Sequence, residues 1–291
     1  GAGHAGCEAA LASAKMGCRT MLLSTNLATA AQMPCNPSIG GPAKGNLVRE
    51  LDALGGEMGR NTDRTQIQIR ELNTSKGPAV RALRAQCDKH AYSAMMRRTL
   101  ETQIGLEFQQ EHVESLLWEP ELVDGARQWR VHGVRTRNGR SIRAHATIIT
   151  TGTFLHGRII VGNNVSDGGR QNEPSATALA ADLRSAGLEL GRLKTGTPPR
   201  IAANSIDFSR MLVQHGSKDP LSFSFDPPPR SEWYETDPDP VYPHIPKSTW
   251  RTQMACYQVH TTSKTHKIIR SNLHQAPMFN GSIKSAGPRY C

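Results

Sequence analysis

Residues 1–6 read Gly1-Ala2-Gly3-His4-Ala5-Gly6, the glycine pattern that joins a strand to a helix in dinucleotide-binding units. The first glycine permits a tight turn, the second lets a pyrophosphate approach the backbone, and the third lets the helix pack close to the sheet. Residues 7–16 are rich in alanine and predict a helix, and residues 19–24 predict a short buried strand. The chain therefore opens as a Rossmann-type α/β unit. The alternative is a glycine turn without a ligand.

The strand that should present this glycine pattern is missing from the sequence. Gly1 stands first, with no initiator methionine before it. We therefore expect the chain to be part of a longer protein that has lost its first strand, and we treat 291 residues as a lower bound on its length. Any targeting segment would have been lost with it.

The residue that usually holds a ribose is also missing. An acidic side chain is expected about 20 residues after the glycines, but the second strand ends in Ser24-Thr25-Asn26. We expect hydroxyl or amide groups to contact the ribose instead.

Composition narrows the class of protein. The chain has 35 Lys and Arg against 25 Asp and Glu, a net charge of +10, which suggests a polyanionic partner, with plain solubility as the alternative. No apolar run approaches the roughly 18 residues of a membrane span. None of the 6 cysteines forms a CxxC pair, and their spacing fits neither a metal site nor a disulfide scaffold. Free thiols in a reducing compartment are the simplest interpretation.

Cys35 lies in a loop, residues 32–45, that is rich in glycine and proline. Loops of this length in compact domains usually have a function. A thiol held there can act as a nucleophile or a proton donor if a cation such as Lys44 lies nearby. An unreactive loop cysteine is the alternative. Cys291 follows another rigid turn, Gly287-Pro288-Arg289-Tyr290.

The remaining pattern predicts alternating helices and strands. Asn46 is expected to begin a helix whose apolar stripe runs to Met58, and Asn138-Gly139 predicts a type I′ hairpin turn. Helices are predicted at residues 79–102, 175–187 and 265–273, strands at 106–110, 113–118, 129–136, 146–151 and 254–259, and an irregular segment with eight prolines at 220–246. The helix at 79–102 carries a basic face that is either solvated or turned toward a polyanion. Residues 194–200 read as a ligand loop or a domain hinge.

Several of these segments together resemble one known family. After GAGHAG come MPCNPSIGGPAKGNLVRELDALGG, LNTSKGPAVRALRAQ, GRLKTGTPPRI, TSKTHKIIRSNL and GPRYC, in order from residue 1 to 291. Together they resemble the MnmG (GidA) family of FAD-dependent tRNA uridine-5-carboxymethylaminomethyl modification enzymes. Family members are about twice as long, so the chain corresponds to an N-terminal part without the C-terminal helical region, and we expect it to be inactive alone.

The resemblance implies a fold and a reaction. It implies an FAD-binding Rossmann-type domain at residues 1–200 and part of an inserted NAD(H)-binding α/β domain at 201–291. It implies modification of the C5 atom of the tRNA wobble uridine with FAD, NADH and methylene-tetrahydrofolate, in a heterotetramer with the GTPase MnmE. A homodimer in the cytoplasm is expected, without membrane attachment, and an organellar homologue is the alternative.

The resemblance also assigns site residues. Gly1, Ala2, Gly3, His4, Ala5 and Gly6 match the loop for the FAD pyrophosphate. Val113 matches a backbone contact to the FAD adenine, displaced by a local length difference of one residue, and Ser175 matches a further FAD contact. Gly287, Pro288, Arg289, Tyr290 and Cys291 match the start of the NAD(H)-binding segment. Cys35 and Cys291 match the two essential cysteines, with their roles as nucleophile and acid or base left open. No metal is implied.

Three alternatives remain at this point. A TrmFO-like folate- and FAD-dependent tRNA uridine methyltransferase shares the glycine loop and the chemistry at uracil C5, and its product would be a plain methyl group. A flavin disulfide reductase would need a redox-active cysteine pair, which the sequence lacks. An RNA-binding protein without catalysis would also be basic, but it would not bind flavin.

Overall fold

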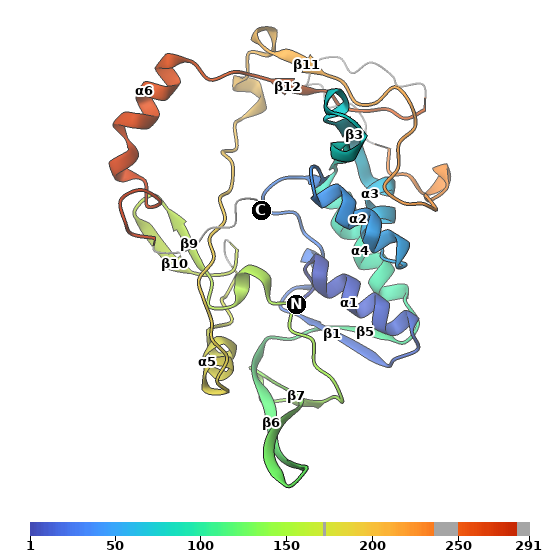
Figure 1. The fold of residues 1–291 in the computed structure, drawn as a ribbon, viewed down its shortest axis with the longest axis vertical. Coiled ribbons are helices and arrows are strands. Elements are labelled where there is room, and N and C mark those ends of the chain that lie inside the picture. Colours follow the sequence, from blue (N-terminus) through green and yellow to red (C-terminus); the bar gives the residue numbers. More distant parts are fainter. Residues whose placement is uncertain (171–172, 236–249, 284–291) are drawn as a thin grey trace.

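The structure is a computed structural model that describes residues 1–170, 173–235 and 250–283 (Figure 1). Its helices are α1 (His4–Lys15), α2 (Lys44–Ala53), α3 (Met58–Thr65), α4 (Lys89–Thr102), α5 (Thr177–Ser185) and α6 (Ser263–Ser271). Its strands are β1 (Thr20–Ser24), β2 (Ser38–Gly40), β3 (Gln66–Leu72), β4 (Ala82–Cys87), β5 (Leu106–Gln110), β6 (Val113–Val123), β7 (Ala126–Thr136), β8 (Ser141–Arg143), β9 (Arg158–Val161), β10 (Asn164–Asp167), β11 (Leu212–Gln214) and β12 (Cys256–Gln258).

The glycine pattern forms the turn into α1, as the sequence predicts. Gly3 is the N-cap residue in an extended conformation, and α1 then buries Cys7 and Leu11 against the core. A Cβ atom at Gly6 would lie 1.8 Å from the carbonyl oxygen of Gly1, so only glycine allows this approach. The first turn of α1 is therefore fixed against the chain segment that precedes it.

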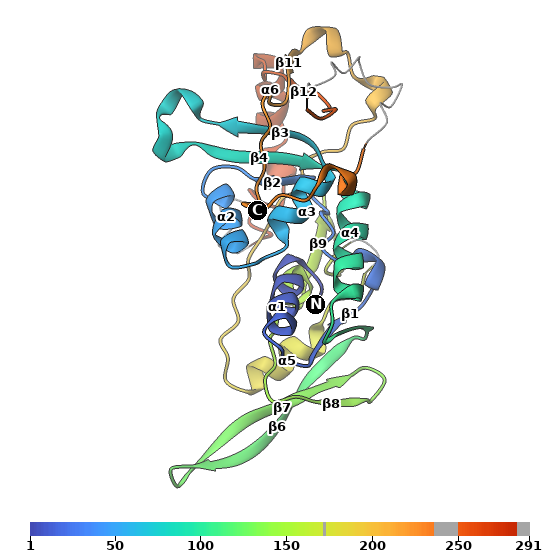
Figure 2. The ribbon, with the colours of Figure 1, turned by 90° about the vertical axis from the view of Figure 1, so that its right-hand side faces the viewer.

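Strand β1 pairs in parallel with β5, from Thr20 opposite Leu106 to Ser24 opposite Gln110. Helices α1 and α4 pack beside this pair (Figure 2). The helices and the strand pair share one hydrophobic cluster, which includes Leu11 from α1, Met96 from α4 and Leu22 from β1. This parallel pair with flanking helices is the part of the chain that matches the predicted α/β unit most directly.

The helix predicted for residues 79–102 is wrong in its first third. Residues Ala82–Cys87 form β4, the central strand of a second sheet with the order β2-β4-β3, and α4 begins only at Lys89. Asp88 caps α4 by accepting hydrogen bonds from the N–H groups of His90 and Ala91. Strand pairing with residues distant in the chain overrides the helical propensity of Ala, Arg and Gln, which composition alone does not reveal.

The helix expected from Asn46 to Met58 is also divided. Helix α2 begins at Lys44, two residues earlier, so Asn46 lies inside it rather than capping it. Gly55, with a φ of +85°, follows the end of α2 and prevents the helix from continuing, and Met58 begins α3. The apolar stripe seen in the sequence therefore spans two short helices.

A three-stranded antiparallel sheet, β6-β7-β8, projects from the end of the molecule that carries α5 (Figures 1 and 2). Its β7–β8 turn at Asn138-Gly139 is not type I′, because only Gly139 has a positive φ. Gly139 instead donates its N–H to the carbonyl of Thr136, as in a three-residue hairpin loop. A type I′ geometry occurs at the β6–β7 turn, where Asp124 and Gly125 have φ values of +51° and +79°.

The buried strand expected at residues 146–151 is not present in the structure. This segment pairs with no strand in the part of the chain that the structure describes, and Ile148 and Ile149 are 64% and 41% exposed. Thr150 nevertheless contacts the glycine loop, because its Oγ1 donates a 2.9 Å hydrogen bond to the carbonyl of Gly1. The segment therefore lies beside the glycine loop without strand pairing among the described residues.

The later elements agree better with the sequence. Helix α5 lies within the predicted segment 175–187 and packs on β6 through a second hydrophobic cluster that includes Leu116 and Leu179. Strand β12 and helix α6 fall where the sequence predicts them. Residues 220–235 are irregular, as expected, and the rest of the proline-rich segment, residues 236–246, lies outside the described residues.

Residues after 200 contact the first half of the chain closely. Phe223 is fully buried in the first hydrophobic cluster, and Trp250 packs against that cluster. Arg251 donates hydrogen bonds to the carbonyls of Asp63 and Arg64 at 2.6 and 2.8 Å. The domain boundary expected at residue 200 stays a prediction. Residues 217–226 and 250–254 pack on α3 and β3.

The Asp63 carboxylate organises this contact. Its two oxygens accept the backbone N–H groups of Phe223 and Ser224 at 2.8 and 2.9 Å. Burial raises the pKa of Asp63 to about 6, opposed by these two hydrogen bonds and by the charge of Arg251. The folded chain therefore binds a proton at Asp63 more tightly than the unfolded chain does.

We expect Asp63→Ala to destabilise the protein, because two buried N–H donors lose their acceptor, at about 1–3 kcal/mol each. The Asp63 carboxyl should also make the wild-type free energy of unfolding rise as the pH falls from 8 through 6 toward 4, since the native state binds the extra proton. Asp63→Ala should lose this component. Urea unfolding of both proteins at pH 5 and pH 8 measures it.

The control is Asp226→Ala, on the same segment, whose carboxylate is 92% exposed. This change should alter the free energy of unfolding by no more than about 1 kcal/mol. An identical pH dependence in wild type and Asp63→Ala would contradict the role given to Asp63.

Candidate functional site

A cavity of about 220 Å³ lies over the glycine loop. Its wall is built from the carboxyl end of β1, the start of β6 and the segment before α5. Thr150 to Phe154, Arg170, Pro174 and Ala176 are the lining residues of that segment, which runs close to Gly1 and Gly3. In open α/β sheets, ligands bind outside the carboxyl ends of parallel strands, and this cavity has that position. Its lining includes Gly1, Ala2, Gly3, Thr25, Val113 and Pro174.

The glycine loop offers an open approach to the N-terminus of α1. A Cβ atom built on Gly3 would meet no atom within 4 Å, so this position faces open space. Helix N-termini attract anions because their N–H groups and dipole point outward. His4 is half-buried, its ring centroid lies 5.6 Å from that of Tyr92, and burial lowers its pKa. The ring of His4 is thus packed against the core, and the role of His4 in the phosphate loop stays a prediction.

Val113 and Ser175, both predicted cofactor residues, differ in their placement. Val113 lines the cavity as the first residue of β6. Ser175 lies between Pro174 and Ala176, which both line the cavity, while its own hydroxyl donates to the carbonyl of Phe154 at 3.1 Å. The structure thus brings Val113 and the segment of Ser175 to the glycine loop.

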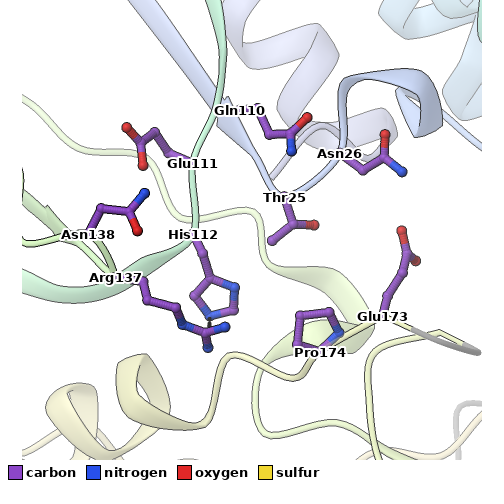
Figure 3. Close-up of a pocket in the computed structure, with 9 residues that line it drawn as sticks. All are labelled: Thr25, Asn26, Gln110, Glu111, His112, Arg137, Asn138, Glu173 and Pro174. Atoms are coloured by element: carbon purple, nitrogen blue, oxygen red, sulfur yellow. Dashed lines mark hydrogen bonds between the residues drawn. The ribbon is translucent and has the colours of Figure 1, made fainter.

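A second cavity of about 380 Å³ adjoins the first and shares with it Thr25, Glu111, His112 and Pro174 (Figure 3). The side chains of His112 and Arg137 point toward each other, with their Nε2 and Nη2 atoms 3.2 Å apart. Burial and then the charge of Arg137 lower the pKa of His112, so its ring is neutral and accepts from the guanidinium. This cavity lies at the carboxyl ends of β1 and β5.

Thr25 and Asn26, where the sequence analysis expected hydroxyl and amide groups, line this second cavity, but the analysis missed Glu111, His112 and Arg137. Glu111 follows β5 directly, and its N–H donates to the carbonyl of Ser24 at the end of β1. Arg137 follows β7. Both positions become apparent only when β5 is known to pair with β1, since the two strands lie far apart in the chain.

Arg170 is a further cation that the sequence analysis missed. It lines the cavity over the glycine loop and forms an ion pair with Glu173. Its guanidinium also donates to the hydroxyl of Thr29 at 3.0 Å and lies 5.1 Å from the centre of the Phe154 ring. These contacts hold the segment before α5 against the chain that follows β1.

Cys35 lies beside the first cavity, which its neighbour Pro34 lines. The Cys35 thiol donates to the carbonyl of Gly196 at 3.4 Å. The Cys35 carbonyl accepts hydrogen bonds from Lys89, at 3.5 Å, and from Arg200. Two cations thus contact Cys35, from α4 and from the 194–200 loop, whereas Lys44, the cation expected from the sequence, begins α2.

The other cysteines have different surroundings. Cys7 and Cys87 are buried, and burial raises the pKa of each thiol to about 12, so both are unreactive. Cys18 is exposed. Cys291 and the predicted residues Gly287, Pro288, Arg289 and Tyr290 lie outside the described residues.

Among the described residues, no cluster of three or more His, Cys, Asp and Glu side chains is placed to hold a metal ion. No helix in the described ranges has the length and apolar character needed to cross a membrane.

Comparisons with known proteins match the chain over its whole length. It is 54% identical to the tRNA uridine 5-carboxymethylaminomethyl modification enzyme MnmG of Chloroflexus aurantiacus, covering 100% of this chain and 44% of that protein. It is 50% identical to the MnmG of Heliobacterium modesticaldum, covering 41% of that protein. The chain therefore spans less than half the length of these curated relatives.

A solved structure agrees. The GidA protein of Aquifex aeolicus superposes with a TM-score of 0.83 at 43% identity, covering 100% of this chain and 45% of that one. The mixed α/β fold is thus shared with a GidA crystal structure, and the resemblance seen in the sequence is confirmed. Because the family model described as "Glucose inhibited division protein A" matches residues 1–291, the chain belongs to the GidA family.

Proposed function

We propose that this chain is the cofactor-binding and thiol-bearing part of an enzyme that adds a carboxymethylaminomethyl group to C5 of the tRNA wobble uridine. The observation that supports it most is the place of Cys35 next to Pro34, which lines the cavity over the glycine loop, in a chain 54% identical to a protein named as that enzyme. The cofactors would be FAD, NADH and methylene-tetrahydrofolate.

The residues around the glycine loop fit an FAD. The missing Cβ of Gly3 leaves room for a pyrophosphate at the N-terminus of α1. Gly1 to Gly6 would hold that pyrophosphate, Val113 the adenine through its backbone, and Ser175 a further part of the cofactor. Thr25 lines both cavities and can supply a hydroxyl to the ribose in place of the absent acid. When bound, the flavin supplies hydride or one-carbon transfer chemistry.

Cys35 would prepare the uracil for reaction. C5 of uracil is a poor nucleophile, but addition of a thiolate to C6 moves the electrons of the C5–C6 double bond onto C5 and the neighbouring carbonyl. C5 can then form a bond to a methylene electrophile, and loss of the C5 proton followed by departure of the thiolate restores the ring. Cys291 would act in the other role, as acid or base, and which cysteine takes which role stays open.

The remaining assignments concern the whole protein. We propose that residues 201–291 belong to an inserted NAD(H)-binding domain, with Gly287 to Cys291 at the start of its nucleotide segment. The net charge of +10 suits tRNA as the substrate. The partner would be the GTPase MnmE, with a homodimer of this protein in the cytoplasm.

The pyrophosphate assignment predicts a selective effect of Gly3→Val. The backbone at Gly3 is extended, with φ −69° and ψ 179°, so valine fits the fold, but its side chain would occupy the open space over the loop. We expect the Kd for FAD to rise by about tenfold or more, which is a loss of about 1.4 kcal/mol or more. Quenching of flavin fluorescence on binding measures this Kd.

Ala12→Val is the control, because Ala12 is exposed on the same helix. It should leave the Kd for FAD unchanged, and both variants should keep the far-UV circular dichroism of the wild type. Unweakened FAD binding by Gly3→Val would place the pyrophosphate elsewhere.

The thiol assignment predicts the outcome of Cys35→Ser in the gene of the host organism. The variant should still bind FAD, while the carboxymethylaminomethyl nucleoside disappears from tRNA. Mass spectrometry of the wobble nucleosides measures this, with Cys18→Ser as the matched control that should keep the modification.

Two results would change the proposal. Normal modification in the Cys35→Ser strain would remove Cys35 from the chemistry. A plain 5-methyluridine that depends on the intact gene would favour the methyltransferase alternative.

A further inference from the structure

Three separate segments converge on Cys35. They are the cysteine loop itself, the first turn of α4 with Lys89, and the 194–200 loop with Arg200. Arg200 donates to two successive carbonyls, those of Pro34, at 3.1 Å, and Cys35. The Cys35 carbonyl oxygen therefore accepts from both Arg200 and Lys89, which come from different parts of the chain.

Lys89 and Arg200 donate to the same carbonyl oxygen, so their positive charges lie close enough to repel each other. Burial first, and then the positive charge of Arg200, lower the pKa of Lys89, while the charge of an ionised Cys35 acts in the opposite direction. Asp88, the nearest acid in sequence, directs its carboxylate to the N–H groups of His90 and Ala91. A negative charge on the Cys35 sulfur would relieve the repulsion between the two cations.

We propose that Lys89 and Arg200 are positioning residues for the Cys35 thiol, Arg200 by fixing the cysteine loop and Lys89 by stabilising the negative charge of the reacting sulfur. This inference rests on the proposed function for the importance of Cys35. Its physical content concerns the thiol alone, so it can be tested without tRNA.

The resting arrangement explains why such help is needed. The thiol donates a 3.4 Å hydrogen bond to the carbonyl of Gly196. A sulfur that loses its proton also loses this hydrogen bond. A nearby cation offsets part of that loss, because only the thiolate is the nucleophile.

The test is alkylation of Cys35 in the full chain by two reagents that differ in charge. In each reaction the sulfur forms a bond to carbon, iodide leaves and the thiol proton goes to the buffer. Iodoacetamide is neutral and iodoacetate is an anion, so the ratio of their rates reports the local positive potential. Peptide mass spectrometry follows each cysteine separately, and exposed Cys18 is the internal reference.

In Lys89→Met we expect the rate with iodoacetate at Cys35 to fall about fivefold more than the rate with iodoacetamide, the size of one charge a few ångströms away in water. Lys89→Arg should restore the ratio, which a merely structural role would not require. The matched control is Arg98→Met, which deletes an exposed cation from the same helix. It should leave the ratio of the two alkylation rates unchanged.

Arg200→Met should raise the rates of both reagents at Cys35, because the 194–200 loop that covers the thiol loses its anchor, and Arg200→Lys should restore only part of the protection, since one ammonium replaces a two-carbonyl contact. In the wild type, raising the salt concentration should lower the iodoacetate rate at Cys35 more than at Cys18. This last measurement needs no variant, so a misfolded variant leaves the inference testable.

Protection of Cys7 and Cys87 from both reagents verifies that each variant is folded. An unchanged reagent ratio in a folded Lys89→Met, or equal salt effects at Cys35 and Cys18, would overturn the inference. Neither result depends on tRNA modification, so this failure is distinct from a failure of the proposed function.

Discussion

The close approach of Gly6 to Gly1 is the constraint on which the site depends. A single methyl group at residue 6 would lie 1.8 Å from the Gly1 carbonyl oxygen and 2.7 Å from the Thr150 hydroxyl. Three pieces of chain therefore meet at a point where there is no room for any side chain. This contact sets the distance between α1 and the segment before α5, and with it the cavity that lies over the glycine loop.

Local patterns in the sequence predicted the elements whose stability is local. Helices α1, α5 and α6 and strand β1 lie close to the predicted segments, because their helical or apolar pattern is complete within the element. Strand β4 was predicted as helix, since its identity depends on β2 and β3 on either side of it. The Asn138-Gly139 turn shows the same limit: the dipeptide predicts a turn, but the register of β7 with β8 decides its type.

The site could be predicted only in part for a related reason. The glycine loop and the cysteine loop are continuous stretches, so the sequence identifies both, and the family comparisons agree with that resemblance. The groups that surround them, Arg137, Arg170, Lys89 and Arg200, reach their partners through contacts between distant parts of the chain. A charged residue in a sequence does not reveal its partner. The sequence therefore pointed to Lys44 as the cation near Cys35, whereas in the structure Lys89 and Arg200 contact Cys35.

The separation of these contacts along the chain also has a consequence for synthesis. The partner of the Cys35 thiol, Gly196, is 161 residues further on. At a translation rate of roughly 5–20 residues per second, about 10–30 s pass between the synthesis of the cysteine and that of the loop that covers it. During that interval neither Gly196 nor Arg200 exists to hold the thiol. The nascent chain thus carries this sulfur without its partner loop for that interval, and a reducing environment would protect the thiol from oxidation until the loop is made.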